Sequence, residues 1–561
     1  MSQSRSFDPF LEPWLCLRVP RMAEYSRLLT DFARWARIEV DAQANYTDRY
    51  APPALDTYDR EGEVVNRIVL NRWYDEQHTE VYRRGIIGLP YLEKAPHLLT
   101  FAMGYLLSQS DISLHCPVTL TGAVAYVLAN HAPDDVRQRY LYDLIRTDGK
   151  AKTGGTWATE QHGGSDVGAT TTKAVPAGDV FRLHGLKWFT SNANSSLALA
   201  TARPEDAPPG SAGLGLYLVP GYLGSGRPNR YRIRRLKDKL GTKGLPTGEI
   251  ELTGAEAIEV APPPYGFKLM MEALEYSRVH NAVGSAGAQR RALHEALAWS
   301  AQREAFGYVL IDYPMVQDEL IRLRVNFEAG ALLAFEAALT LDEVQRDPDR
   351  RTFLRLVTAL AKYLTAEYAI TSSRVALELI GGNGYTSDYP VARLLRDAQV
   401  LTVWEGPANI QALELLRLLS PKYQGLQQYE SRVHEILSVM PDELEQLRRA
   451  LDRRLQQDRE IVTTVIRDDS SRQLYARKLL HRLSESFAFA LLCQAAANSP
   501  RTGYEAQRHT ARLYLEEIER AGIGEENQDS RRVIVESLRG EAAELHRNGP
   551  EKRSENWPPT Y

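Results

Sequence analysis

The spacing of hydrophobic and polar residues changes twice along the first half of the chain. Apolar residues recur every three or four positions in "VVNRIVLNRWYDEQHTEVYRRGII" and "PVTLTGAVAYVLANH", so residues 1–150 are predicted to form a helical domain. From 151 to 265, short alternating runs such as "FRLHGLKWFTSN" and "GEIELTGAEAIEV" are separated by turn residues. This second pattern predicts a β domain.

Long amphipathic patterns return in the second half, for example in "MVQDELIRLRVNFEAGALLAFEAALTL". They predict a helical bundle over residues 266–420 and a further helical domain over 421–545, followed by a disordered tail at 546–561. Because helices and strands do not alternate, the order favours a multi-domain α+β protein over a doubly wound sheet.

Composition and charge exclude several classes of function. The 561 residues are 43% hydrophobic, with a net charge of −4 and a pI near 6.4, so nucleic-acid binding would need a local basic patch. Three scattered cysteines, Cys16, Cys116 and Cys493, are too few for a disulfide framework or a cysteine metal site, and we expect them to be small buried hydrophobes. No metal site is predicted.

The N-terminus lacks an apolar signal core and no stretch of about 20 apolar residues is apparent, which predicts a cytoplasmic or organelle-matrix protein without a membrane span.

The usual nucleotide-binding and hydrolase motifs are absent: there is no G-x-G-x-x-G, G-x-x-x-x-G-K-[ST], H-E-x-x-H or G-x-S-x-G. Instead, the segment "TWATEQHGGSDVGATTTKA" (156–174) gathers hydroxyls and glycines at the start of the β domain. Its adjacent glycines, Gly163 and Gly164, let the backbone approach a flat or anionic ligand. Taken alone, the segment is also consistent with a plain polar loop.

Five further motifs follow this segment at wide spacings: "KWFTS" (187–191), "RLKDKLG" (235–241), "QREAFG" (302–307), "ELIGGNGYTSDYPVARLLRDA" (378–398) and "VWEGPANI" (403–410). In this order they resemble the acyl-CoA dehydrogenase flavoprotein superfamily. The likeness is closest to the AidB branch, flavoproteins of the bacterial adaptive response to DNA alkylation, and includes the helical region after Leu419. It implies an N-terminal helical domain, a central β-barrel domain, a helical-bundle domain and an extra C-terminal helical domain.

The resemblance implies a role for Glu405, which follows the strand-like apolar run at 401–404. By this likeness Glu405 is the catalytic base of an FAD-dependent acyl-CoA dehydrogenase of fatty-acid metabolism: it takes the α-proton of a thioester while hydride leaves the β-carbon for the flavin. Burial raises carboxyl basicity, and Val403 and Trp404 are expected to exclude water. Taken alone, Glu405 could instead cap a helix that begins near Pro407.

Some branches of the superfamily carry the base on a helix, directly before an arginine. That position is Ser277 here, before Arg278, and Glu275 lies two positions away, about 200° around a helix. Glu405 is therefore the matching base. The resemblance implies that Arg278 supports the active-site loop and the substrate; a surface salt bridge is the alternative.

The cofactor residues are also carried over from the resemblance, with FAD as the cofactor. The alternative for Trp188 is a core tryptophan of a strand. A homo-oligomer, at least a dimer and usually a tetramer, follows because some of these residues contact the FAD of a neighbouring subunit. Those cross-subunit residues are Arg303, Phe306 and the turn Gly381, Gly382 and Asn383. The others are Thr159, Gly164, Ser165 (which also meets the substrate), Trp188, Phe189, Thr190 and Asn409.

Departures from the family pattern at Pro314, Glu378 and Pro407 leave acyl-CoA turnover less secure than FAD binding. The electron acceptor, an electron-transfer flavoprotein or oxygen, is not indicated. The alternative function is that of an AidB-like flavoprotein that binds and protects DNA with little dehydrogenase turnover. Residues 420–561 carry 22 Lys and Arg against 23 Asp and Glu, so this segment has no excess positive charge to support that alternative.

Overall fold

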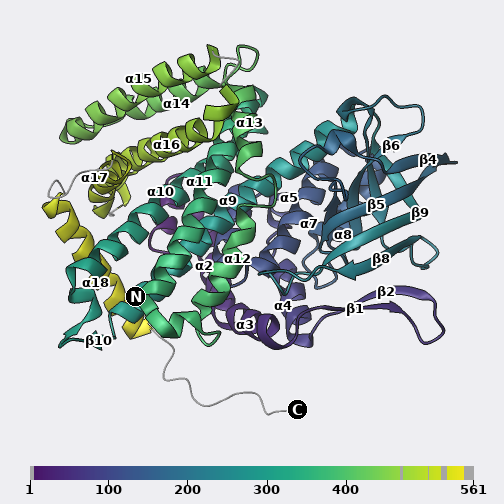
Figure 1. Ribbon diagram of the computed structural model, residues 1–561, viewed down its shortest axis with the longest axis horizontal. Helices are drawn as coiled ribbons and strands as arrows, with labels where there is room; N and C mark the ends of the chain where they lie inside the picture. Colours follow the sequence, from purple (N-terminus) through teal and green to yellow (C-terminus); the bar gives the residue numbers. More distant parts are fainter. Residues whose placement is uncertain (1–5, 468–471, 503–504, 520–526, 549–561) are drawn as a thin grey trace.

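The N-terminal part of the chain is mainly helical, as expected. The computed structural model describes residues 6–467, 472–502, 505–519 and 527–548 (Figure 1). The N-terminal elements are α1 (Leu11–Cys16), α2 (Met22–Trp35), the π-helical turn η1 (Ala36–Val40), α3 (Asp41–Tyr50), β1 (Ala54–Tyr58), β2 (Val64–Val69), α4 (Arg72–Arg83), α5 (Leu89–Leu92), α6 (His97–Ser108), α7 (Ile112–His131) and α8 (Asp134–Ile145).

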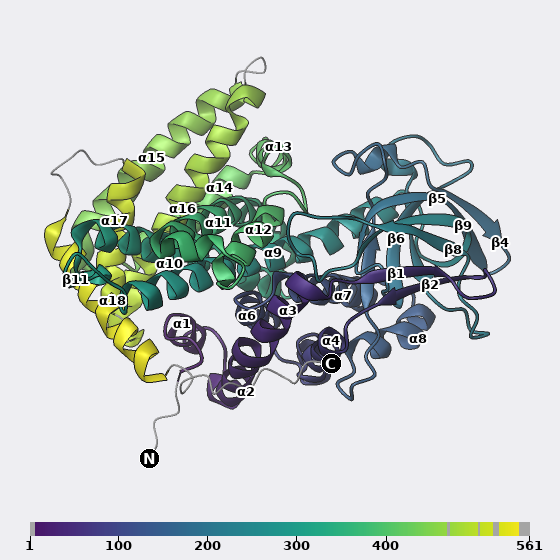
Figure 2. The same cartoon turned by 60° about the horizontal axis from the view of Figure 1, so that its bottom comes forward.

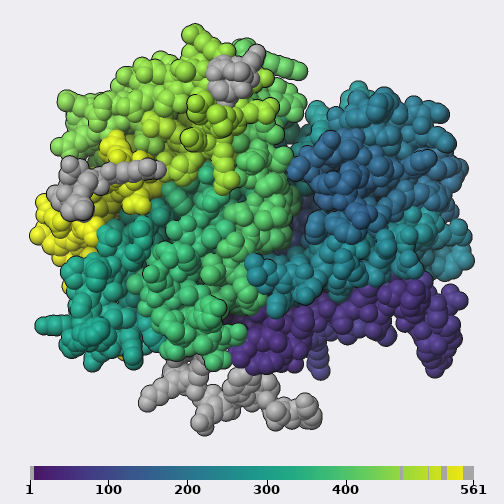
Figure 3. Space-filling view, in the orientation of Figure 1, coloured from purple at the N-terminus to yellow at the C-terminus, as the bar shows by residue number. Residues whose placement is uncertain are grey.

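The β1–β2 hairpin is a difference from the sequence prediction, which assigned its second strand to a helix. The strands pair antiparallel, and the helix begins only after Asn71, whose side chain caps α4 by accepting from the Tyr74 amide at 2.9 Å. Asn66 donates to the carbonyl of Tyr231 at 2.7 Å, which fixes the hairpin along the β domain (Figures 2 and 3). A partner more than 160 residues away therefore decides this local structure.

Helix α7 corrects a second expectation. It is the one helix in the described part of the chain that is long and apolar enough to cross a membrane, but 94% of its apolar window is buried inside the protein. Such burial is typical of a core helix, and α6 beside it is buried on all sides as well.

The β domain is a sheet that closes on itself. Strand order is β3-β6-β4-β5-β9-β7, β6 also pairs with β7, and β8 pairs with β9. Most pairs are antiparallel, while β3 and β4 run parallel to β6. The strands are β3 (Gly154–Trp157), β4 (Lys173–Ala177), β5 (Val180–Ser191), β6 (Leu197–Pro204), β7 (Gly215–Pro220), β8 (Tyr231–Leu236) and β9 (Thr247–Ala261), with short 3-10 turns η2 (Val167–Ala169) and η3 (Ser211–Gly213).

The helical bundle lies between the β domain and the C-terminal helices (Figure 1). Three long helices, α9, α10 and α11, pack along one another and against α6 and α7. The bundle elements are α9 (Tyr265–Ser300), β10 (Glu304–Ala305), β11 (Tyr308–Val309), η4 (Leu310–Asp312), α10 (Pro314–Val344), η5 (Pro348–Arg350), α11 (Arg351–Ile380), η6 (Gly381–Tyr385), α12 (Pro390–Leu401) and α13 (Ala408–Leu418). The run at 401–404 is therefore a helix end and a turn, and the expected strand is wrong.

The C-terminal helices cover the bundle on the side away from the β domain. They are α14 (Gly425–Ser438), the turn η7 (Asp442–Leu444), α15 (Glu445–Arg467), α16 (Arg472–Thr502), α17 (Ala506–Glu519) and α18 (Gln528–Asn548). Glu541 of α18 pairs with Arg290 at 2.6 Å and with Arg324 at 2.7 Å. The tail predicted from 546 is helical to Asn548, and 549–561 lie outside the described residues.

The cysteines partly match the prediction. Cys116 and Cys493 are buried, but Cys16 is exposed at the end of α1. The described residues contain no group of three or more His, Cys, Asp or Glu side chains that could hold a metal ion.

Candidate active site

Glu405 lies in the short loop between α12 and α13, and its backbone is held in an unusual conformation. Its φ of 58° is in the left-handed region, which costs a non-glycine residue about 1–2 kcal/mol. The Glu405 carbonyl accepts a hydrogen bond from Arg278 Nε at 2.9 Å and one from Gln411 Nε2 at 3.2 Å. These donors, from α9 and α13, stabilise a strained residue of the kind that is enriched at functional sites.

The Glu405 side chain is half-buried, and one of its two carboxyl oxygens lacks a partner among the described residues. Its Oε2 atom is shielded from solvent and makes no hydrogen bond within the described structure, and α13 begins at an N-cap Pro407 without a side-chain cap bond. The capping alternative is therefore not realised. Burial raises the pKa of Glu405 to about 7, although the positive charges of Arg278 and Lys362 lower it. A partly buried carboxyl with a pKa near neutrality has the properties of a general base.

Two segments distant in sequence shield this loop. Trp404 packs against a small apolar cluster of Cys116 from α7, its neighbour Leu120 one turn on, and Leu245 from the loop before β9. The thiol of Cys116 lies near enough to Glu405 for the Glu405 charge to raise the pKa of the thiol, in addition to the effect of burial. Val403, which was also expected to exclude water, is 62% exposed, so only Trp404 has that role.

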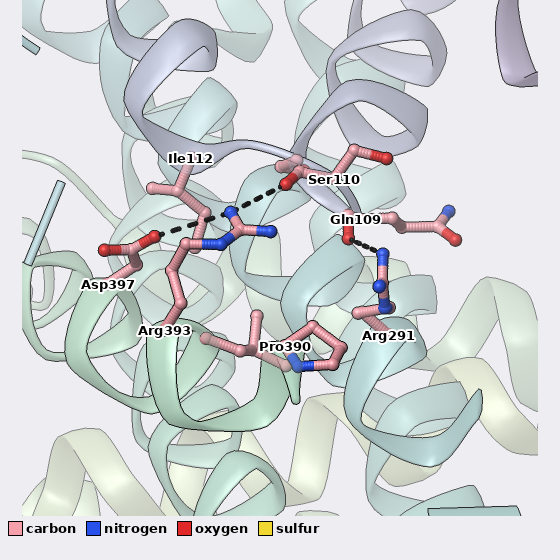
Figure 4. Close-up of a pocket in the computed structure, with 9 residues that line it drawn as sticks. Gln109, Ser110, Ile112, Arg291, Pro390, Arg393 and Asp397 are labelled. Atoms are coloured by element: carbon pink, nitrogen blue, oxygen red, sulfur yellow. Dashed lines mark hydrogen bonds and ion pairs between the residues drawn. The ribbon is translucent and has the colours of Figure 1, made fainter. Parts of the chain in front are cut away.

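Helix α12, which leads into the Glu405 loop, is anchored by a polar cluster at the α6–α7 connection (Figure 4). Arg393 Nη1 donates to the Ser110 carbonyl at 2.9 Å, and Arg291 of α9 donates to the Gln109 carbonyl at 3.1 Å. On the β-domain side, Asp397 accepts from the amide of Thr242 at 2.5 Å. The position of Glu405 thus depends on the N-terminal helices, the bundle and the β domain together.

A buried ion pair with β5 fixes the loop after β3, which carries Thr159, Gly164 and Ser165. Lys187 Nζ lies 2.9 Å from Glu160 Oε1, and the two side chains are 0% and 3% exposed. Burial alone would raise the pKa of Glu160, but the Lys187 charge and hydrogen bonds from threonine hydroxyls and amides hold it at about 2. Glu160 is thus the anionic centre of this loop.

The same lysine begins an irregular stretch of β5. The β5–β9 register shifts between Lys187 and Thr190, so Trp188 and Phe189 form a bulge, and the Trp188 amide donates to the Thr159 carbonyl at 3.0 Å. Bulges re-aim side chains and are common beside active sites. Here the bulge leaves Phe189 57% exposed.

Trp188 and Thr190 are partly committed to other contacts. The ammonium of Lys237 lies 3.5 Å from the centroid of the Trp188 ring, a cation–π contact. The Thr190 hydroxyl donates to the Gly248 carbonyl at 2.8 Å, which leaves the oxygen only as an acceptor for a ligand. Trp188 is half-buried and so differs from the fully buried core tryptophan that was its alternative.

The residues around this bulge suit a flat, amphipathic ring such as a flavin. Residues 163–165 are exposed, so their amides are accessible, and a Cβ at Gly164 would fall 2.5 Å from Thr159 Oγ1, which requires glycine there. Ser191, next to Thr190, lies close enough to the Cys116 thiol beside the Glu405 loop to lower its pKa, although burial raises that pKa overall. The candidate ring-binding surface and the orphaned carboxyl are therefore neighbours.

Apart from Asn409, which lies four residues after Glu405, the remaining predicted cofactor residues do not lie at this place. Arg303 and Phe306 follow the end of α9 in the β10–β11 hairpin, and Trp299 packs on Tyr389 with ring centroids 5.7 Å apart, which brings the hairpin near η6. Because Trp299 follows Arg278 by 21 residues, this end of α9 is about 31 Å along the helix from the Glu405 contact. Gly381, Gly382 and Asn383 are exposed in η6, and Asn409 is exposed in the first turn of α13.

Two contributors to the loop were not indicated by the sequence. Lys362 of α11, 1% exposed, donates to the Thr402 carbonyl at 3.3 Å, and Asn281 of α9 donates to the Leu401 carbonyl at 3.1 Å. A lysine on the buried face of a strongly apolar helix was the available signal. Glu275, set aside as a base, is buried on α9 and has a pKa raised by burial to about 7.

Comparison with known proteins agrees with this geometry. Three family models match: the adaptive response protein AidB N-terminal domain over residues 8–148, and the acyl-CoA dehydrogenase middle and C-terminal domains over 155–255 and 265–419. Acyl-CoA dehydrogenase family member 11 of Caenorhabditis elegans is 32% identical over 527 residues, covering 88% of this chain and 84% of that protein. Putative acyl-CoA dehydrogenase AidB of Escherichia coli (strain K12) is 30% identical over 422 residues, 72% of this chain and 75% of that protein.

The similarity extends to solved structures. The crystal structure of Caenorhabditis elegans ACDH-11 in complex with C11-CoA superposes with a TM-score of 0.84 at 30% identity, covering 91% of this chain and 90% of that one. The chain thus belongs to the acyl-CoA dehydrogenase family, FAD flavoproteins that oxidise CH–CH groups. Its N-terminal domain is of the AidB type, which confirms the predicted fold class and branch.

Proposed function

We propose that this protein converts an acyl-CoA to the α,β-unsaturated thioester, with Glu405 as the base. The observation that carries the proposal is the half-buried Glu405 beside the ring-binding surface of the β domain: its Oε2 atom is shielded from solvent and makes no hydrogen bond in the described structure, and its pKa is raised to about 7. FAD bound at that surface supplies the hydride acceptor.

The residues of this chain have distinct tasks in the reaction. Glu405 takes the α-proton, the electron pair of that C–H bond forms the α,β double bond, and the β-hydrogen leaves as hydride. Trp404 excludes water, which strengthens the electrostatic contacts of the carboxylate. Arg278 and Gln411 hold the Glu405 backbone in its left-handed conformation, so the carboxyl is oriented before substrate arrives.

The acyl chain is proposed to be of medium length. This follows from the relative that was solved with C11-CoA and has 30% identity to this chain. Anaerobic mixing of the FAD-loaded protein with acyl-CoAs from four to sixteen carbons tests the proposal. The C10 to C12 thioesters are expected to bleach the flavin fastest, and fastest bleaching by the C4 thioester would contradict it.

The rate of flavin reduction is expected to depend on pH with an acid limb near pH 7. Since Glu405 must be ionised to accept a proton and its pKa is raised to about 7, the rate should rise as pH increases through 7 and then level off. Stopped-flow measurements between about pH 5.5 and 9 with one medium-chain acyl-CoA will check this. A rate that stays constant across this range, as expected for a glutamate with its ordinary pKa near 4.5, would contradict the assignment.

A second copy of this chain is proposed to complete the FAD site. The support is the position of Arg303, Phe306 and η6 at the far end of α9, and the 96% exposure of Phe306 at a hairpin turn. Phe306→Ser is expected to weaken self-association and to lower the FAD content. Light scattering and the flavin-to-protein ratio measure both effects. The control is Tyr222→Ser, another exposed aromatic (67%) in the β domain, which should change neither; an unchanged Phe306→Ser protein would contradict the proposal.

No observation favours the DNA-binding alternative. Several arginines of α15 and α16 are already paired with carboxylates: Arg448 and Arg449 with Glu445, Arg459 with Glu430, and Arg482 with Asp458. An arginine that is already neutralised by a carboxylate is less available to neutralise a DNA phosphate and so to release the counterions of the DNA.

A further inference from the structure

We propose that Lys362 is a positioning residue for the dehydrogenation: from α11 it holds the loop that carries Glu405 and places a positive charge behind the carboxylate. The inference rests on the proposed role of Glu405. It concerns a residue outside the motifs that identify the family in this chain.

Lys362 is a buried lysine without an ion-pair partner among the described residues. Its side chain is 1% exposed, and its one hydrogen bond in the described structure goes to the carbonyl of Thr402, at 3.3 Å. A buried charge is costly unless something compensates it. The carboxylates whose charge reaches Lys362 are Glu405, across the loop, and Glu367, on its own helix.

Three side chains from two helices hold the loop between α12 and α13 through its carbonyl oxygens. Asn281 of α9 binds the Leu401 carbonyl, Lys362 of α11 binds that of Thr402, and Arg278 of α9 binds that of Glu405. Lys362 is the only one of the three contacts on the α11 side. Removing it would free the turn at Thr402 while the Asn281 and Arg278 contacts remain.

Lys362 also contributes to the electrostatic environment of the Glu405 carboxyl. Arg278 from α9, Lys362 from α11 and the neutral Cys116 thiol from α7 face the carboxyl. Burial lowers the pKa of Lys362 to about 7, with Arg278 acting in the same direction and Glu405 opposing it. Because the two cations stabilise the ionised carboxylate, loss of Lys362 should raise the pKa of Glu405 above 7.

The first test is the pH dependence of flavin reduction in Lys362→Met, in the full-length FAD-loaded protein. An opposite charge close to a carboxyl typically shifts its pKa by 1 unit or more, so we expect the acid limb to move up by about 1 pH unit. Lys362→Arg keeps the charge and should restore the wild-type limb. Asn281→Ala loosens the same loop without a charge change, so it should lower the plateau rate and leave the limb in place.

The second test does not depend on turnover. Urea unfolding of the wild type, Lys362→Met, Glu405→Gln and the double variant forms a cycle that isolates their interaction. We expect the effect of Lys362→Met to differ between the two backgrounds at about pH 7, and this difference to disappear at about pH 5, where Glu405 is protonated.

An unmoved acid limb in Lys362→Met, or an effect of that change that is the same with and without Glu405 at neutral pH, would overturn the role of Lys362. Neither result touches the proposed function, which fails separately if Glu405→Gln reduces flavin normally. A moved limb with Lys362→Arg matching the wild type supports the proposal.

Discussion

Glu405→Gln is expected to lower the rate of flavin reduction by acyl-CoA about 10²-fold to 10⁴-fold, which is the usual contribution of a general base. The glutamine amide has nearly the same size as the carboxylate, but it is too weakly basic to take the α-proton. The Arg278 and Gln411 contacts are to the Glu405 carbonyl and are retained, so the bound FAD should remain. Anaerobic stopped-flow absorbance measures the rate, and the flavin-to-protein ratio reports binding.

Glu275→Gln is the matched control for this substitution. Glu275 is also buried on α9, and burial raises its pKa to about 7, but its charge is compensated by Arg278, Arg355 and Arg351. Its replacement should leave flavin reduction within about tenfold of the wild-type rate. A greater loss in Glu275→Gln than in Glu405→Gln would mean that the base has been placed on the wrong residue.

Glu160→Ala is expected to lower the free energy of unfolding by about 3–5 kcal/mol, because it leaves the charge of Lys187 buried without its partner. The loop that carries Thr159 and Gly164 should lose its support, and the protein should be purified with less FAD. Denaturant unfolding and flavin content measure the two effects.

Two controls separate this effect from a general loss of charge. Glu61→Ala breaks an exposed pair with Arg60 and should cost less than about 1 kcal/mol. Glu160→Leu with Lys187→Met removes both buried charges and should regain much of the lost stability. A loss below 1 kcal/mol in Glu160→Ala would contradict the importance of the pair.

The Glu160 contribution also has a defined pH dependence. Its pKa is held at about 2, below the ordinary value of 4.5, so the folded state favours the ionised form. This stabilisation is fully present above about pH 4.5 and is lost as pH falls toward 2. The wild type should therefore lose stability relative to the double variant as the pH falls from about 4.5 toward 2.

The sequence predicted the helical and β regions because their periodic patterns persist over many residues. The β1–β2 hairpin was missed because "VVNRIV" also fits a helical spacing, and its strand conformation depends on contacts of Asn66 with β8. The run at 401–404 was misassigned for a related reason: a few apolar residues do not distinguish a strand from a helix end.

The candidate site was predictable only where a motif marked it. Glu405, Arg278 and the loop at 159–165 were named from motif resemblance, and the structure places Arg278 on the Glu405 carbonyl. Lys362 and Asn281 lie on long amphipathic helices, where periodicity predicts which face is buried but not which distant loop that face meets. The left-handed φ of Glu405 and the Glu160–Lys187 pair likewise depend on tertiary contacts.

The central claim is that this chain removes two hydrogens from an acyl-CoA at Glu405. The most direct measurement is an anaerobic single turnover of the FAD-loaded protein with a medium-chain acyl-CoA, followed by flavin absorbance and by mass spectrometry of the thioester. We predict bleaching of the flavin with one unsaturated thioester, lighter by two hydrogens, formed for each flavin reduced. A flavin that stays oxidised with every chain length, while the acyl-CoAs are recovered unchanged, would contradict the account.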